Sequence, residues 1–294
     1  MHNGKSELKI RTAQERSGSS VSALIFTLNE EQNLPSCLDS LDWCDDKFVV
    51  DSYSTDATQK ICEARNVPFI QHAFEGFGSQ RNWALDVLTL KNDWVLILDA
   101  DERVPPTLAS ELEQLARSSH RGIGAYRVRR RLYLWGKWLR YSSLYPSWVV
   151  RFIHRDRVRY INRGHGETQR VDGKIGEIRS YLIDENLKGL DAWFERQIRY
   201  ARKDAEFELN CGRSSSGTSI LFSRDPLRRR AAIKLLATAL PFRGFFYFIY
   251  SYFFRLGFLD GRDGFVFCRM KTMYQDMVEA NKHDLRKARR RTRQ

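Results

Sequence analysis

The chain has 294 residues, of which 42% are hydrophobic, so it is long enough for one large domain or for a domain with an appendage. Its formal net charge of +13 predicts an anionic partner, such as an anionic lipid or a phosphorylated glycan. We expect no nucleic-acid partner, because no RNA- or DNA-binding motif accompanies the basic clusters. The five cysteines show no Cys-x-x-Cys spacing, which argues against a zinc site and a disulfide framework and favours a reducing, cytoplasmic setting.

The first part of the chain predicts a flexible tail followed by alternating strands and helices. Residues 1–20 are polar and lack an apolar core, so we expect a tail and not a signal peptide. Apolar runs then predict strands that start near residues 21, 47, 67 and 94, with helices between them. This alternation predicts βαβ units and a parallel sheet.

Two carboxylates follow the last of these strands, in Trp94-Val-Leu-Ile-Leu-Asp-Ala-Asp-Glu102. Four consecutive apolar residues suit a strand that is buried on both faces. Because ligands bind at the carboxyl ends of parallel strands, and right-handed crossovers bring these ends together, we expect Asn29, Asp51 and Asp99 along one rim. The oxygens of Asp99 and Asp101 suit Mg²⁺ or Mn²⁺, which commonly bridges a carboxylate to a diphosphate. A turn with solvated acids is the alternative.

The sequence beyond residue 180 predicts a helical region. Residues 191–205 place Phe194, Ile198, Ala201 and Ala205 on one helical stripe. The serine-rich stretch 213–219 predicts a flexible loop.

An unusually aromatic stretch runs from Phe242 to Phe258. Its uncharged run, residues 244–254, is shorter than the ~20 residues that a membrane-spanning helix needs. Aromatic side chains flanked by arginines suit a helix that lies in the membrane interface, and a buried helix or a dimer contact is the alternative.

Three motifs, taken in order, resemble those of the inverting GT-A glycosyltransferases of the large family 2. They are Thr27-Leu-Asn-Glu-Glu31, Val49-Val-Asp-Ser-x-Ser-x-Asp-x-Thr58 and Leu98-Asp-Ala-Asp-Glu102. A fourth, Gly257-Phe-Leu-Asp-Gly-Arg-Asp-Gly264, is typical of the bacterial branch that includes lipopolysaccharide-core glucosyltransferases. The resemblance runs from about Val21 to Glu167 and implies an α/β, Rossmann-like GT-A fold with a mostly parallel sheet flanked by helices. The dinucleotide-binding and P-loop glycine patterns are absent from the sequence, which disfavours those enzyme classes.

By position, the resemblance implies a nucleotide-sugar site at the ends of the first two strands. Thr27, Asn29 and Glu30 would line it, and Asp51 would bind the base or the ribose, because a carboxylate accepts from a uracil N–H or from sugar hydroxyls. Many relatives have a second acid directly after the position of Asp51, where this chain has Ser52.

The resemblance also implies a cation site. Asp99 would hold ribose or a metal-bound water, and Asp101 would be a ligand of Mg²⁺ or Mn²⁺ that serves catalysis. Arg81 would reach the diphosphate or Asp99; an exposed helix arginine is the alternative.

Inverting transfer needs a base that takes the proton from the acceptor hydroxyl. Relatives place a His-Glu pair after a strand like that predicted over residues 148–154. In this chain a glycine separates the two, in His165-Gly-Glu167. We expect Glu167 to be the base, with His165 and Asp156 as alternatives.

These features together predict a metal-dependent inverting transferase that moves a hexosyl group from a nucleotide diphosphate sugar, UDP-linked, to a bacterial surface-glycan or lipopolysaccharide-type acceptor. We expect it in the cytoplasm, peripheral on the inner face of the cytoplasmic membrane. The alternatives are a polyprenyl-phosphate sugar transferase and a catalytically silent basic module that binds membrane or RNA. The expected organisation is a tail (1–20), a catalytic GT-A domain (21–180), a helical acceptor- and membrane-associating region (181–281) and a basic tail (282–294).

Overall fold

The computed structural model describes residues 19–118, 122–164, 166–211 and 242–291. Most of the predicted N-terminal tail, the predicted loop at 213–219 and the side chain of His165 lie outside the described residues. The strands are β1 (Ser22–Thr27), β2 (Asp46–Asp51), β3 (Phe69–Gln71), β4 (Trp94–Asp99), β5 (Glu102–Arg103), β6 (Ile123–Leu134), β7 (Lys137–Trp138), β8 (Ser147–His154), β9 (Val158–Arg163), β10 (Gly166–Val171) and β11 (Lys174–Glu185). The helices are α1 (Leu34–Asp39), α2 (Thr58–Ala64), α3 (Phe77–Val87), α4 (Pro106–Arg117), α5 (Gly189–Cys211), α7 (Arg243–Ile249), η1 (Tyr250–Phe254), η2 (Gly257–Asp260) and α8 (Gly261–Arg291).

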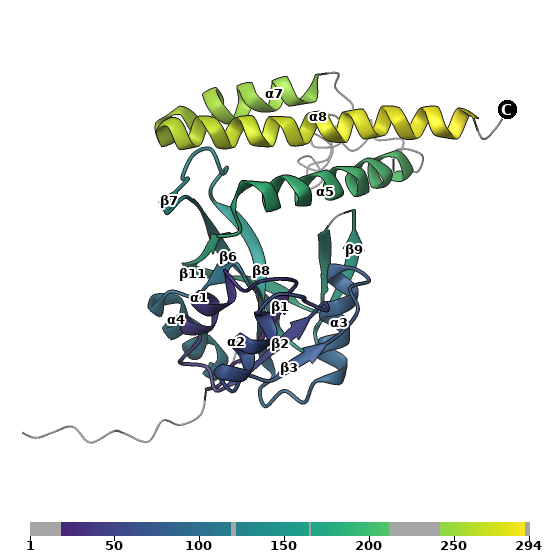
Figure 1. The fold of residues 1–294 in the computed structure, drawn as a ribbon. Coiled ribbons are helices and arrows are strands. Elements are labelled where there is room, and N and C mark those ends of the chain that lie inside the picture. The colour runs from purple at the N-terminus through teal and green to yellow at the C-terminus, as the bar shows by residue number, and fades with distance from the viewer. Residues whose placement is uncertain (1–18, 119–121, 165, 212–241, 292–294) are drawn as a thin grey trace, which may run out of the picture.

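One large sheet organises the N-terminal two thirds of the chain (Figure 1), with strand order β3-β2-β1-β4-β8-β6-β11-β5 and with β7 paired to β6. The first four strands are parallel, as predicted, and their carboxyl ends meet at one edge. Beyond β4 the pairing is mixed: β8 is antiparallel to both β4 and β6, whereas β11 is parallel to β6. A separate hairpin of β9 and β10 packs beside α3.

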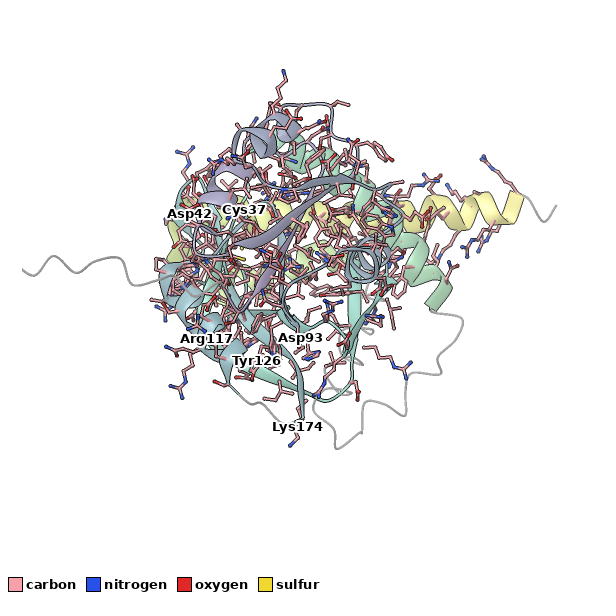
Figure 2. All side chains as sticks on the ribbon, turned by 90° about the horizontal axis from the view of Figure 1, so that it is seen from below. Cys37, Asp42, Asp93, Arg117, Tyr126 and Lys174 are labelled. Atoms are coloured by element: carbon pink, nitrogen blue, oxygen red, sulfur yellow. The ribbon has the colours of Figure 1, made fainter. Side chains whose placement is uncertain are left out.

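Both faces of the central strands are buried, which confirms the expectation for Val95–Leu98. Side chains that alternate along β4 enter two different cores: Leu96 and Leu98 face one of them, and Val95 and Ile97 face the other. Helices α1 and α4 cover the first face, and α3 covers the second. The described cysteines are buried and unpaired, among them Cys37 on α1 (Figure 2).

The helical C-terminal region predicted from the sequence is confirmed, and Figure 1 shows α5, α7 and α8 gathered at one end of the molecule. Ala201 and Ala205 on α5 pack against Tyr274 and Val278 on α8. The predicted stripe is wrong at Ile198, whose side chain is 57% exposed, because the buried line passes through Gln197 instead. Strand β11 continues past residue 180, where we predicted the domain division; the division itself stays a prediction.

The Gly257–Gly264 motif attaches this helical region to the loop after β7. The Asp260 carboxylate accepts hydrogen bonds from the backbone N–H groups of Arg140, Tyr141 and Ser142 and from the Ser142 hydroxyl, at 2.7–3.1 Å. A Cβ at Gly264 would come within 2.5 Å of both the Asp260 Cβ and the carbonyl oxygen of Gly257. The motif therefore needs a glycine at 264 so that Asp260 can turn toward the loop.

The aromatic stretch presents an exposed face, which we call the aromatic face. Its exposed side chains are Phe242, Phe245, Phe246, Tyr250, Phe253, Phe254 and Phe258. Phe254 is 76% exposed, so the burial that we gave as an alternative does not describe this face. Among the described helices, none combines the length and the hydropathy that crossing a bilayer requires.

Candidate active site

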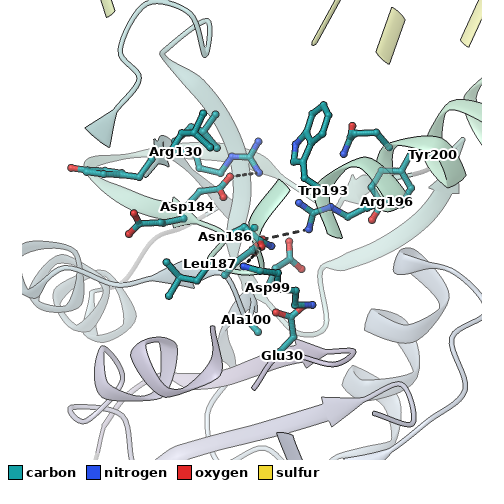
Figure 3. A pocket seen from close by; sticks show the side chains of 18 of the residues that line it. Glu30, Asp99, Ala100, Arg130, Asp184, Asn186, Leu187, Trp193, Arg196 and Tyr200 are labelled. Carbon is teal, nitrogen blue, oxygen red and sulfur yellow. Dashed lines mark hydrogen bonds and ion pairs between the residues drawn. The ribbon is translucent and has the colours of Figure 1, made fainter. Parts of the chain in front are cut away.

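A cavity of about 1140 Å³ lies between the carboxyl edge of the sheet and the helical region (Figure 3). One wall comes from the ends of β1, β2 and β4, and the others come from β6, β11, α5, α7 and α8. Of the predicted site residues, Thr27, Glu30, Asp99 and Asp101 line it. The cavity therefore lies where the sequence predicted ligand binding, at the rim of the parallel strands.

The ends of β1 and β2 are joined behind this wall by Asp51. Its carboxylate is fully buried and accepts hydrogen bonds from the Thr27 hydroxyl at 2.7 Å and from the Ser54 backbone N–H at 2.7 Å. Asn29 adopts a left-handed conformation, with φ of 54°, and its side-chain oxygen accepts from the Thr55 N–H. Ser52, the position where many relatives have an acid, lines the cavity.

Glu30 is held at the cavity by contacts from distant parts of the chain. The Lys188 ammonium lies 2.5 Å from Glu30 Oε1, and the Asn33 amide donates to Oε2 at 2.7 Å. Burial raises the pKa of Glu30, and Lys188 and Asn33 oppose that rise. These contacts fix the start of α5 to the β1 loop.

Asp99 sits between two buried arginines. Arg81 Nη2 on α3 lies 2.7 Å from Asp99 Oδ1, and Arg151 Nη2 on β8 pairs with Oδ2. Burial alone would raise the pKa of Asp99, but Arg151 and Arg81 outweigh it and hold the pKa at about 2. Asp99 is therefore anionic at neutral pH, with both oxygens already engaged.

Arg81 joins Asp99 to Glu167. Its Nη1 pairs with Glu167 Oε1 on β10. The guanidinium lies 5.5–5.7 Å from the ring centroids of Phe26, Phe77 and Tyr160, and the side chain is only 2% exposed. The exposed-arginine alternative is therefore wrong, and Arg81 reaches Asp99 as one of its two predicted positions.

Glu102 completes the charge cluster from the buried side. Arg151 donates to Glu102 Oε1 through Nε at 3.1 Å and through Nη2 at 2.8 Å, and the Asp99 N–H donates to Oε2 at 3.0 Å. Burial raises the pKa of Glu102 to about 7, although Arg151 opposes the rise. Glu102 thus orients both Arg151 and the backbone that carries Asp99.

Asp101 is the carboxylate best placed to hold a cation. Its Oδ2 accepts from the Asn186 amide at 2.9 Å and lies 3.8 Å from Arg196 Nη1. Within the described residues no donor reaches Asp101 Oδ1. The same residues contain no group of three acidic, histidine or cysteine side chains that could hold a metal by itself. One carboxylate plus substrate phosphates is a common ligand set for Mg²⁺, so these residues fit a cation whose coordination the substrate completes.

Glu167 and Asp156 are the two candidates for the base that the structure describes. Glu167 is mostly buried, with 14% of its side chain exposed, and pairs with Arg81; it is not among the residues that line the cavity. Asp156 follows β8 at the end that pairs with Trp94, which is the edge of the sheet opposite to Asp99. That position separates Asp156 from the cavity.

Sequence reasoning missed the cavity residues that come from the second half of the chain. Asp184, the penultimate residue of β11, pairs with Arg130 Nη1 at 3.2 Å; burial raises the pKa of Asp184 to about 6, against the effect of Arg130. Arg151, which pairs with Asp99 but does not line the cavity, had one local signal: it is the one Lys, Arg, Asp or Glu among the mostly apolar residues of β8, and such a residue is buried only when it is paired.

Comparison with known proteins gives the following matches. Residues 22–226 match the model of a family described as Glycosyl transferase family 2. The lipopolysaccharide core biosynthesis glycosyltransferase LpsC of Rhizobium meliloti (strain 1021) is 27% identical over 210 residues, which cover 69% of this chain and 77% of that protein. An uncharacterized glycosyltransferase of Rickettsia bellii (strain RML369-C) is 34% identical over 101 residues, 34% of each chain. The crystal structure of glucosyl-3-phosphoglycerate synthase from Mycobacterium tuberculosis, in complex with Mn²⁺ and UDP-glucose, aligns with 69% of this chain and 82% of its own at 18% identity, with a TM-score of 0.43.

Proposed function

The chain belongs to glycosyl transferase family 2 and is a glycosyltransferase, and we propose that it moves a hexosyl group from a UDP-sugar to a lipopolysaccharide-type acceptor with inversion at the anomeric carbon. The observation that carries the proposal is the cavity with Asp99 and Asp101 at its sheet edge. The name of the LpsC relative supports the class of acceptor.

In this proposal each residue of the site has its own role. Asp101, together with the donor diphosphate, would hold Mg²⁺ or Mn²⁺, and the ion would supply Lewis-acid stabilisation of the charge on the departing nucleotide. Asp99, kept anionic by its two arginines, accepts from hydroxyls of the donor, with Thr27 and Glu30 on the adjoining wall. Asn29 and Asp51 act on the nucleotide through the loop that they shape.

Glu167 is our proposed base, positioned by its ion pair with Arg81. The acceptor hydroxyl oxygen bonds to the anomeric carbon, its proton passes to Glu167, and the bond from that carbon to the phosphate oxygen breaks. The nucleotide diphosphate leaves with the electron pair. Attack from the face opposite to the leaving group inverts the configuration.

A polyprenyl-phosphate acceptor is the second candidate. Cationic side chains on the α5 and α8 side of the cavity, among them Arg196 and Lys271, favour an anionic acceptor. A phosphate nucleophile needs no strong base, so the two candidates differ in whether Glu167 is required.

We extend the proposal to the place of action, the surface of the cytoplasmic membrane. The aromatic face is exposed, and α8 ends in Arg289, Arg290 and Arg291. Aromatic burial and attraction to anionic lipid are the two contributions that hold a peripheral protein at a bilayer.

The deciding test is transfer or hydrolysis of UDP-sugars with and without Mn²⁺. Asp101→Asn keeps the shape of the side chain and removes its charge, so turnover should fall by at least ~100-fold, because a Lewis acid supplies several kcal/mol. EDTA should have the same effect on the wild type. Asp156→Asn is the matched control, because Asp156 lies at the opposite edge of the sheet. Full activity in EDTA would refute the cation.

A further inference from the structure

Three cationic side chains line the part of the cavity that β6, α5 and α8 form. Arg130 on β6, Arg196 on α5 and Lys271 on α8 all line the cavity. Arg130 is paired with Asp184 at 3.2 Å, and Arg196 lies 3.8 Å from Asp101. Among the described residues, no carboxylate oxygen lies within 4.0 Å of the Lys271 ammonium nitrogen, so Lys271 has no ion-pair partner there.

Lys271 sits among aromatic rings. Its Nζ lies 5.7–5.9 Å from the ring centroids of Trp193, Phe267 and Tyr274. Burial, followed by the charges of Arg130 and Arg196, lowers the pKa of Lys271 to about 8. The rings attract the ammonium but carry no net negative charge, so this corner of the cavity keeps an excess of positive charge.

We propose that Lys271, together with Arg130 and Arg196, binds an oxyanion, a phosphate or a carboxylate, that the sugar acceptor carries. The inference rests on the proposed function, since it concerns the second substrate of the same cavity. Fixed ammonium and guanidinium groups facing a shared space are the usual partners of such anions.

The geometry assigns this oxyanion to the acceptor and not to the donor. The proposed donor residues Thr27, Asp99 and Asp101 stand on the strand ends, whereas Lys271 comes from α8, which Figure 1 places at the far end of the molecule from β2 and β3. A cavity of about 1140 Å³ exceeds the ~300–1,000 Å³ of a typical single-ligand site. It has room for a second ligand beside a nucleotide sugar.

One wall of the cavity belongs to the helix that carries part of the aromatic face. Tyr247 on α7 lines the cavity, while Phe245 and Phe246 on the same helix are exposed at 59% and 49%. An acceptor with a lipid part at that face would therefore bring its anionic head group toward Lys271.

The test fills the donor side first. The full chain is saturated with UDP and Mg²⁺, and glycerol 3-phosphate or gluconate is then titrated by calorimetry. At least one of the two anions should bind the wild type, and Lys271→Met should weaken that binding about tenfold or more, because it removes a charge-assisted contact. Lys271→Arg should stay within about threefold of the wild type, since it keeps the charge.

Lys174→Met is the matched control, because Lys174 is exposed at the start of β11, at the periphery of the molecule (Figure 2). Thermal midpoints establish that each variant is folded. Failure of both anions to bind the wild type, or undiminished binding to a folded Lys271→Met, would overturn the inference. So would a loss of UDP binding in that variant, which would move Lys271 to the donor side. A wild type that binds the anion but transfers no sugar would instead contradict the proposed function alone.

Discussion

Replacing Asp260 should release the loop after β7 from the helical region. The Asp260 side chain is 5% exposed, and its carboxylate accepts four hydrogen bonds from residues 140–142. Each hydrogen bond to a charged group contributes about 1.5–3 kcal/mol, but four bonds to one carboxylate are not additive. Removing one partner of a buried charged network costs about 3–5 kcal/mol, and we expect Asp260→Ala to weaken the attachment by that amount.

The assay is hydrogen exchange at the amides of Tyr141 and Ser142. A loss of about 3 kcal/mol corresponds to a local opening that is ~150-fold more frequent, so these amides should exchange faster by about that factor. Asp263→Asn is the control from the same motif. Its partner Lys137 is 3.2 Å away and half exposed, and such a surface pair is worth about 0–1 kcal/mol. Unchanged exchange in a folded Asp260→Ala protein would refute the attachment.

Two further predictions concern the base and the membrane. Glu167→Gln should lower transfer to a hydroxyl acceptor by ~10²–10⁴-fold and leave UDP binding intact, because the base acts on the acceptor. Full transfer by this variant would favour a phosphate acceptor. If Asp184→Asn lost transfer and Glu167→Gln did not, Asp184 would be the base. Replacing Phe245 and Phe253 by Ser should leave the protein folded, because both are at least 50% exposed, and should weaken sedimentation with anionic vesicles by ~10-fold or more. Ile198→Ser, at a site off the aromatic face, is the control, and a wild type that ignores such vesicles at low salt would contradict membrane attachment.

Local sequence was sufficient for the parallel half of the fold. A run of apolar residues such as Val95–Leu98 specifies a strand buried on both faces, and the acids that follow it must then lie at the rim. The α/β class and the helical C-terminal region were predicted from such patterns, and the glycosyltransferase family from the resemblance of the motifs; all three are confirmed. The roles of the individual site residues remain predictions.

Long-range pairing set the limit of what the sequence could predict. Arg151 meets Asp99 because β8 runs antiparallel to β4, with Phe152 opposite Leu96, and no local pattern encodes that register. Lys271 reaches the cavity only through the packing of α8 on α5, which brings distant parts of the chain together. The burial of Ile198 was predicted wrongly because Ala201 and Ala205 form the contact, and a buried stripe through these two alanines can include either residue 197 or residue 198.

Tyr247 lies on a helix, α7, that belongs both to a wall of the cavity and to the aromatic face. One helix carries a cavity residue and the exposed phenylalanines beside it, so a lipid surface in contact with those rings would lie next to one wall of the cavity. An acceptor confined to such a layer would arrive by lateral diffusion in two dimensions, while the water-soluble donor arrives from three. Turnover would then depend on the surface density of the acceptor and not on its bulk concentration.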